Sequence, residues 1–139
     1  MRKRKGTLEE QEQRDKFNAL RSFLRRCWSK YPERLAAIIA ARRQNKGSNK
    51  RLKYEYQCAI CKQWYQWLDK KKARKQGKIG MSVDHIKPCG SFLCDKDYQT
   101  FIPNLFCDRS KLQVLCDVCH DKKTAEERKN ANRRATYKV

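Results

Sequence analysis

Cys58-Ala-Ile-Cys61 and Leu112-Gln-Val-Leu-Cys116-Asp-Val-Cys119 are the two stretches that decide the fold. Each contains a Cys-x-x-Cys pair, whose turn places two thiolates close enough to share one metal ion. Two such pairs complete a tetrahedral site, so the spacing predicts a structural Zn²⁺ held by four sulfur ligands. A redox Cys-x-x-Cys is the alternative, but that motif belongs in an α/β domain, and the second copy argues against it.

The composition explains why a metal would be needed. The chain has 139 residues, of which 39% are apolar, and it contains eight cysteines. A domain with so little apolar material builds a small core and often depends on a metal or on cross-links. No apolar run approaches the roughly 20 residues that cross a bilayer, and the basic start lacks the apolar segment of a secretory signal. We therefore expect a cytoplasmic protein, whose cysteines bind metal rather than form disulfides.

Four further cysteines lie outside the two pairs. Cys27 lies on the apolar face of an expected helix and is predicted to be a buried thiol. Cys89, Cys94 and Cys107 could hold a second metal ion, although their spacing is irregular for such a site.

The charge favours a polyanionic partner. Lys and Arg number 35 against 15 Asp and Glu, a formal net charge of +20. Neutralising phosphates releases counterions, so binding to nucleic acid would be strong and salt-dependent. Aromatic residues are interleaved with the basic ones, since Trp64, Tyr65 and Trp67 precede Lys70–Lys72. A membrane surface would require a basic helix with a continuous apolar face, and the remaining alternative is that the charge only keeps the chain in solution.

The first 53 residues are predicted to form a basic helical extension and a linker. Thr7-Leu-Glu-Glu10 is a capping-box pattern and predicts a helix that runs to about Trp28. A second helix is expected from about 33 to 45, followed by a solvated basic linker over 44–53. This part is expected to be either a DNA-binding arm or a docking surface for another protein. Its arginines are Arg21, Arg25, Arg26, Arg42 and Arg43.

Residues 54–139 are predicted to form one small α+β domain. Apolar runs indicate short strands, and a charged stretch over 69–78 indicates an exposed loop or helix end. A final helix is expected from Asp117 to about Asn130, followed by a basic tail. Strands are expected over 54–58, 79–86 and 112–116. A short helix or an irregular segment is expected over 95–106.

Asp84, His85 and His120 are the residues with catalytic potential. A carboxylate and an imidazole are suitable ligands for a divalent cation, and an imidazole can accept a proton from water. Neighbouring residues on a strand point to opposite faces, so Asp84 and His85 should have different partners. The alternative is that His85 is a polar surface residue and that His120 is a substitute zinc ligand.

Taken together, these motifs resemble the HNH endonuclease family over about residues 54–130. The resemblance rests on the first Cys-x-x-Cys, on Val83-Asp-His-Ile-x-Pro88, and on Leu112-Gln-Val-Leu-Cys-x-x-Cys-His-x-x-Lys-Thr124 in that order. The chain looks most like the small zinc-stapled HNH proteins of bacteriophages and bacteria. The resemblance implies a ββα-metal fold for residues 54–139, with the two predicted helices as an N-terminal extension.

The same resemblance implies a role for each matching residue. His85 matches the general base, while Asp84 and His120 match the ligands of a catalytic Mg²⁺ or Mn²⁺. The activity implied is hydrolysis of DNA phosphodiester bonds, by nicking or double-strand cutting, which leaves a 5′-phosphate and a 3′-hydroxyl. The residues that match the structural zinc ligands are Cys58, Cys61, Cys116 and Cys119. Apart from the resemblance, the positive charges that flank the proposed site are expected to hold the DNA backbone, the alternative being that they are only solvated; these residues are Lys87, Lys111 and Lys123.

One position departs from the family pattern. The Asn that usually precedes Leu-Gln is Lys111 in this chain. Asn104 is the nearest upstream Asn and could take its place if residues 95–110 fold back, although such an Asn is more often a turn residue.

The biological setting implied by the resemblance is the bacterial host cytoplasm, for a homing enzyme or a packaging-machine component encoded by a phage. The second hypothesis is a zinc-stapled nucleic-acid-binding or accessory protein without efficient catalysis. A homodimer, or a phage protein bound through the N-terminal helices, is the expected protein partner. An RNA substrate is less favoured than double-stranded DNA.

Overall fold

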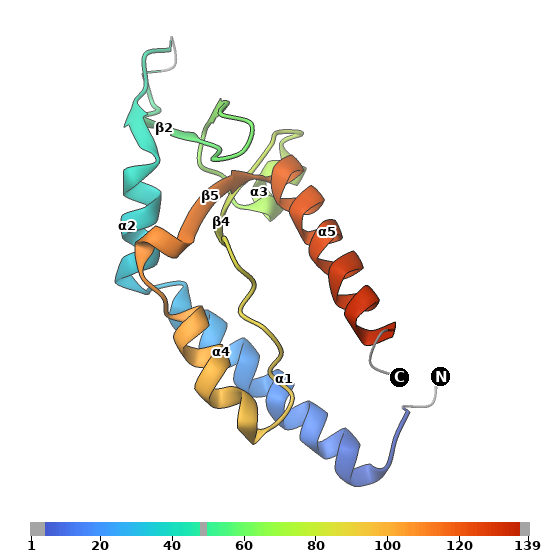
Figure 1. Cartoon of the computed structure of the whole chain (residues 1–139). Coiled ribbons are helices and arrows are strands. Elements are labelled where there is room, and N and C mark those ends of the chain that lie inside the picture. The colour runs from blue at the N-terminus through green and yellow to red at the C-terminus, as the bar shows by residue number, and fades with distance from the viewer. Residues whose placement is uncertain (1–4, 48–49, 137–139) are drawn as a thin grey trace.

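The computed structural model describes residues 5–47 and 50–136, with side chains up to residue 131. The architecture is α+β, with a three-stranded and a two-stranded antiparallel sheet among helices (Figure 1). None of the helices in these segments is long and apolar enough to span a membrane. The helices are α1 (Leu8–Trp28), α2 (Pro32–Ala40), α3 (Lys70–Lys75), α4 (Tyr98–Leu105) and α5 (Asp117–Thr136), and the strands are β1 (Arg42–Gln44), β2 (Tyr54–Gln57), β3 (Trp64–Tyr65), β4 (Met81–His85) and β5 (Leu112–Cys116).

The first helix begins and ends where the sequence predicts. The Thr7 hydroxyl accepts a hydrogen bond from the Glu10 amide at 3.2 Å, and the Glu10 carboxylate accepts one from the Thr7 amide at 2.9 Å. This reciprocal cap satisfies two amides of the first turn. The prediction that Cys27 is buried is wrong, because its side chain is exposed. Trp28 takes the inward position instead, and adjacent helical residues are about 100° apart around the axis.

The second helix is shorter than predicted. It ends at Ala40, and residues 42–44 form strand β1, which pairs antiparallel with β2. The Ala41 carbonyl accepts a hydrogen bond from the Gln57 amide at 2.9 Å, so pairing with β2 replaces the last predicted turns. The described residues at either end of the expected linker continue this hairpin, where the Asn45 backbone amide donates to the Lys53 carbonyl at 3.0 Å.

The predicted domain boundary after residue 53 falls inside that β1–β2 hairpin. Ala37 of α2 is buried in the same cluster as Cys58 and Met81, which lie beyond the boundary. The N-terminal segment and the rest of the chain therefore share one core.

Strands β4 and β5 form the second sheet, as predicted for 79–86 and 112–116. Asp84 pairs with Gln113 and His85 pairs with Leu112. Helix α5 follows β5 directly, and the Asp117 carboxylate at its start accepts a hydrogen bond from the Gly80 amide at 2.9 Å. The first turn of α5 is therefore fastened to the beginning of β4.

Two hydrophobic clusters make up the core. One surrounds β4, β5 and the four paired cysteines, and the other joins Phe17 of α1 to Phe92 and to Phe101 of α4. Helices α1 and α4 lie side by side over this second cluster (Figure 1). Trp28 packs against both clusters and connects them.

Gly80 is closely surrounded by side chains of Asp117 and Ala73 and by the backbone of Leu68. A Cβ atom at this position would lie 2.7 Å from the Asp117 carboxylate, 2.8 Å from the Leu68 carbonyl oxygen and 3.1 Å from the Ala73 Cβ. We therefore expect Gly80→Ala to lower the free energy of unfolding by about 1–3 kcal/mol. Urea denaturation would measure the loss. Gly77→Ala is not a suitable control, because Gly77 has a φ of +62°; Gly47→Ala is the matched control. Equal stability of Gly80→Ala and the unsubstituted protein would contradict the prediction.

Candidate metal centre and adjacent polar site

The four cysteines of the two Cys-x-x-Cys pairs come together, as predicted. Their Sγ atoms all lie within 4.8 Å of one another, and Cys61 Sγ is 3.9 Å from Cys116 Sγ. A tetrahedral Zn²⁺ with bonds of about 2.3 Å places its sulfur ligands about 3.8 Å apart. All eight cysteines are free thiols, so these four are available as ligands. The cluster could hold a structural metal such as zinc.

This cluster is the only group of three or more potential metal ligands that gathers closely enough for one ion in segments 5–47 and 50–136. In these segments Cys89, Cys94 and Cys107 do not lie close enough together to share one metal ion. Cys89 and Cys107 are instead buried thiols, and burial raises the pKa of each.

Backbone hydrogen bonds position the two turns of the cluster. Cys58 follows β2, and its amide donates to the Gln63 carbonyl at 3.0 Å. The next amide, that of Ala59, donates to the Val114 carbonyl of β5 at 2.9 Å. The first turn is thereby attached to the strand that leads to Cys116 and, one helical turn later, to Cys119. Lys62, with a φ of +62°, supplies the left-handed residue that closes the first turn.

The cysteine cluster is electrostatically crowded. Burial, together with the neighbouring sulfur atoms of Cys116, Cys58 and Cys61, raises the pKa of the Cys119 thiol to about 12. Burial also tends to raise the pKa of Cys58, but backbone amides donated by Cys116, Cys61 and Ile60 outweigh it and bring that pKa to about 6. Four thiolates so close together require a cation between them, since like charges oppose one another's ionisation.

Asp84 and His120 meet beside this cluster. His120 Nε2 lies 3.7 Å from Asp84 Oδ1. The other oxygen, Oδ2, is 2.9 Å from the Lys123 ammonium and accepts a hydrogen bond from Gln113 Nε2 at 3.1 Å. His120 is outside the sulfur cluster. The structure therefore brings together two of the three predicted catalytic residues.

Lys123 is held by several oxygen atoms. Its ammonium pairs with Asp84 and with Glu127, and it donates to the His85 carbonyl at 2.9 Å. Burial would lower the pKa of Lys123, but the hydrogen bonds to Glu127 and Asp84 raise it overall. Lys123 is predicted to bind phosphate. In the structure its charged side chain is 17% exposed and pairs with Asp84.

His85 lies on the opposite face of β4 from Asp84. It is 9% exposed, and its ring lies against the Trp28 ring with 4.9 Å between centroids. His85 Nε2 is 2.9 Å from the Leu105 carbonyl oxygen. Because a carbonyl only accepts hydrogen bonds, Nε2 carries the proton and Nδ1 is the basic nitrogen of the neutral ring.

The remaining predicted residues lie around the ends of β4 and β5. The side chains of Lys87 and Lys111 are exposed. The Asn104 amide donates to the Cys89 carbonyl at 3.3 Å. In the described segments no hydrogen bond joins Asn104 to Asp84 or His120.

Three residues of the site were missed by sequence reasoning. Glu127 carries a detectable signal, because it lies four residues after Lys123 on one helix face. Gln113 becomes a partner of Asp84 only through the strand register. Trp28 is distant in sequence from His85, and its position depends on how α1 packs.

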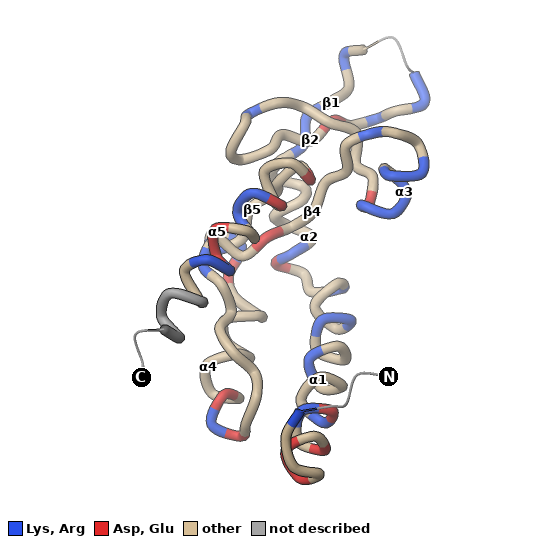
Figure 2. The backbone as a smooth tube through the Cα atoms, turned by 90° about the vertical axis from the view of Figure 1, so that its right-hand side faces the viewer, with Lys and Arg blue, Asp and Glu red and all other residues tan. Residues whose placement is uncertain are grey.

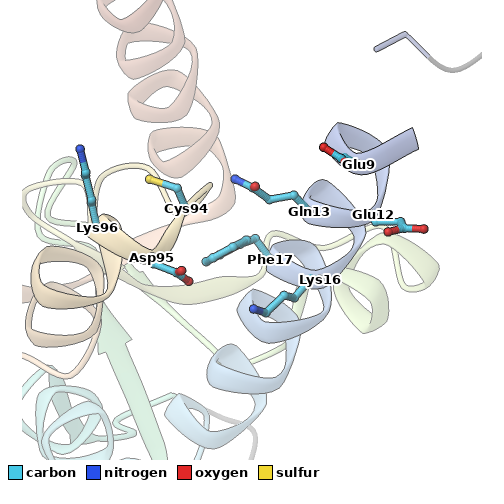
Figure 3. Close-up of a pocket in the computed structure, with 8 residues that line it drawn as sticks. All are labelled: Glu9, Glu12, Gln13, Lys16, Phe17, Cys94, Asp95 and Lys96. Carbon is cyan, nitrogen blue, oxygen red and sulfur yellow. The ribbon is translucent and has the colours of Figure 1, made fainter. Parts of the chain in front are cut away.

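A separate surface depression lies between α1 and the turn at residues 94–96 (Figure 3). Phe17 forms part of its wall, and Gln13 donates to the Leu93 carbonyl at 3.0 Å beside it. The lining mixes acidic and basic side chains and includes Cys94, but none of the residues predicted for catalysis, for the four-cysteine zinc site or for DNA binding.

Comparison of the chain with models of protein families, with curated proteins and with solved structures finds no match.

Proposed function

We propose that the protein is a metal-dependent endonuclease of the HNH type, which hydrolyses phosphodiester bonds of double-stranded DNA. The observation that carries the proposal is the meeting of Asp84 Oδ1 and His120 Nε2 at 3.7 Å, beside the four-cysteine cluster. Carboxylate oxygen and imidazole nitrogen are both ligands of divalent cations. The net charge of +20 supports a polyanionic substrate.

The order of the elements supports the same proposal. Antiparallel strands β4 and β5 are followed without a break by α5, which is the element order of a ββα-metal fold. Asp84 lies near the end of the first strand, and His120 lies in the first turn of the helix. A zinc ion at the cysteine cluster would fix the junction between β5 and α5 and thereby the position of His120.

Asp84 and His120 fit a catalytic metal as two ligands from adjacent elements. Asp84 turns Oδ1 toward His120, while Lys123 and Gln113 hold Oδ2 and so orient the carboxylate. Mg²⁺ or Mn²⁺ bound there would stabilise the negative charge that develops on a phosphate during hydrolysis. Lys123 has a supporting role in this arrangement, because its ammonium orients Asp84 instead of contacting phosphate directly.

His85 is proposed as the general base through Nδ1. The hydrogen bond from Nε2–H to the Leu105 carbonyl fixes the ring orientation and the tautomer. A base fixed in this way can accept a proton from water. Because the ring is only 9% exposed and lies against Trp28, this role requires a local opening next to Trp28 that lets water reach it.

A second candidate is a zinc-stapled nucleic-acid-binding or accessory protein without efficient catalysis. Two observations favour it, the burial of His85 and the ion pair that already neutralises Asp84. The two candidates share the fold and the charge, and they differ in whether bound DNA is cut.

We expect zinc-loaded protein to convert supercoiled plasmid to open-circular or linear DNA when Mg²⁺ or Mn²⁺ is added, and to leave it intact in buffer without these metals. Asp84→Asn should reduce the rate by about 100-fold or more, since it removes a charged ligand oxygen. Gel electrophoresis over time measures the conversion. Asp95→Asn, at an exposed acid outside the site, is the matched control. Full activity of Asp84→Asn would refute the proposed metal site, and tight binding without cutting would favour the second candidate.

A further inference from the structure

The short helix α3 concentrates positive charge in one place. Five of its six residues are Lys or Arg, and the sixth, Ala73, is completely buried. Figure 2 shows this helix as an almost continuous basic segment. Cations three and four positions apart on one helix repel each other, and so short a helix is unstable alone. The rest of the fold must therefore hold it in place.

Specific contacts provide that support. The Asp69 carboxylate caps the helix by accepting from the Lys72 amide at 2.8 Å. Ala73 lies under the helix against the Gly80 region, and its carbonyl accepts a hydrogen bond from the Lys78 amide at 2.9 Å. The helix, anchored by these contacts, thus presents Lys71, Lys72 and Lys75 to solvent. In the described segments none of these three lysines forms an ion pair with an acid.

One of these basic residues ties α3 to the proposed nuclease site. Lys70 Nζ lies 2.7 Å from Asp121 Oδ1, and Asp121 directly follows His120. Lys70 and Arg74 both lower the pKa of Asp121, the first mainly by its hydrogen bond. Helix α3 therefore lies beside the first turn of α5, as Figure 1 also shows.

We propose that Lys71, Lys72 and Lys75 of α3 form a binding surface for the phosphate backbone of duplex DNA, next to the site where the strand is cut. This inference rests on the proposed function. A helix of six residues is about 9 Å long, and about 9 Å of duplex carries roughly five phosphates. The three lysines match such a segment in charge and in extent. Their role is to position the substrate, while Asp84 and His120 act on it.

The test compares two variants of equal charge. Lys71→Gln/Lys72→Gln/Lys75→Gln removes the surface, and Gln preserves helix propensity. Lys30→Gln/Lys53→Gln/Lys96→Gln removes three exposed lysines that are scattered over the molecule. Circular dichroism and zinc content confirm that both variants are folded. Fluorescence anisotropy then measures binding to a labelled DNA duplex at several salt concentrations, without Mg²⁺ or Mn²⁺, so that binding is separated from cutting.

The α3 variant should bind duplex DNA at least about tenfold more weakly in 0.1 M salt. Its slope of log K against log salt should fall by up to about 2.7, because each phosphate contact contributes about 0.9. The scattered variant should lose less than about one in slope. Equal losses in both variants, or unchanged binding by the α3 variant, would overturn the inference. Tighter binding of duplex RNA than of duplex DNA would overturn the choice of DNA.

Failure of this inference can be told apart from failure of the proposed function. An α3 variant that binds weakly but cuts plasmid normally at saturating DNA supports both. Wild-type protein that binds through α3 but never cuts supports the binding surface and refutes the nuclease. Wild-type protein that does not bind duplex DNA refutes both.

Discussion

Cys116→Ser is expected to abolish metal binding and unfold the protein. Cys116 is 1% exposed and belongs to the larger core cluster, and its sulfur lies 3.9 Å from the sulfur of Cys61. Structural zinc contributes roughly 10–16 kcal/mol of apparent binding free energy in small zinc domains. Whole domains are stable by only about 5–15 kcal/mol. Loss of one thiolate ligand therefore removes a large part of the stability of the fold.

The measurement is zinc content per chain together with the far-UV circular dichroism spectrum. Cys27→Ser is the matched control, because Cys27 is exposed and outside the cluster, and it should keep both the metal and the fold. A Cys116→Ser protein that contains no zinc and still shows the native spectrum and cooperative unfolding would refute a stabilising metal at this cluster.

His85→Ala is expected to lower the rate of plasmid cleavage by about 100- to 10,000-fold, the usual contribution of general acid–base catalysis. The substitution also removes a ring that packs on Trp28 and bonds to the Leu105 carbonyl. A truncation of this kind costs stability as well as chemistry. Cleavage rates therefore have to be compared under conditions in which urea denaturation shows the variant to be fully folded.

Trp28→Phe separates the two effects. It disturbs the same packing and leaves the imidazole in place, so it should lose stability but retain most of the cleavage activity. An equal loss of cleavage in Trp28→Phe and His85→Ala would show that His85 acts only through packing. Full cleavage by His85→Ala would remove it as the base.

The sequence predicts best those features that are encoded locally. The first helix is confirmed because Thr7 and Glu10 form their cap within one turn. The gathering of the four cysteines is confirmed because each pair is a local turn and both pairs flank predicted strands. The burial of the strands containing Val83 and Val114 likewise follows from short apolar runs.

Features that depend on distant parts of the chain were not predictable. Arg42-Arg-Gln44 has no strand pattern, and it becomes β1 only because β2 offers a pairing edge. The alternation of a strand predicts that Asp84 and His85 face opposite sides, but not that His85 meets Trp28 and the Leu105 carbonyl. Those partners lie in segments whose positions are set by tertiary packing.

The indole of Trp28 belongs to both hydrophobic clusters and also touches the ring of His85. A side chain shared in this way couples the unfolding of the two clusters, because neither can open without exposing the same ring. A partner that bound α1 and shifted its C-terminal end would therefore also change the packing of the His85 imidazole, which lies directly against Trp28. The N-terminal helix is therefore an integral part of the fold, joined to the core around His85 through Trp28.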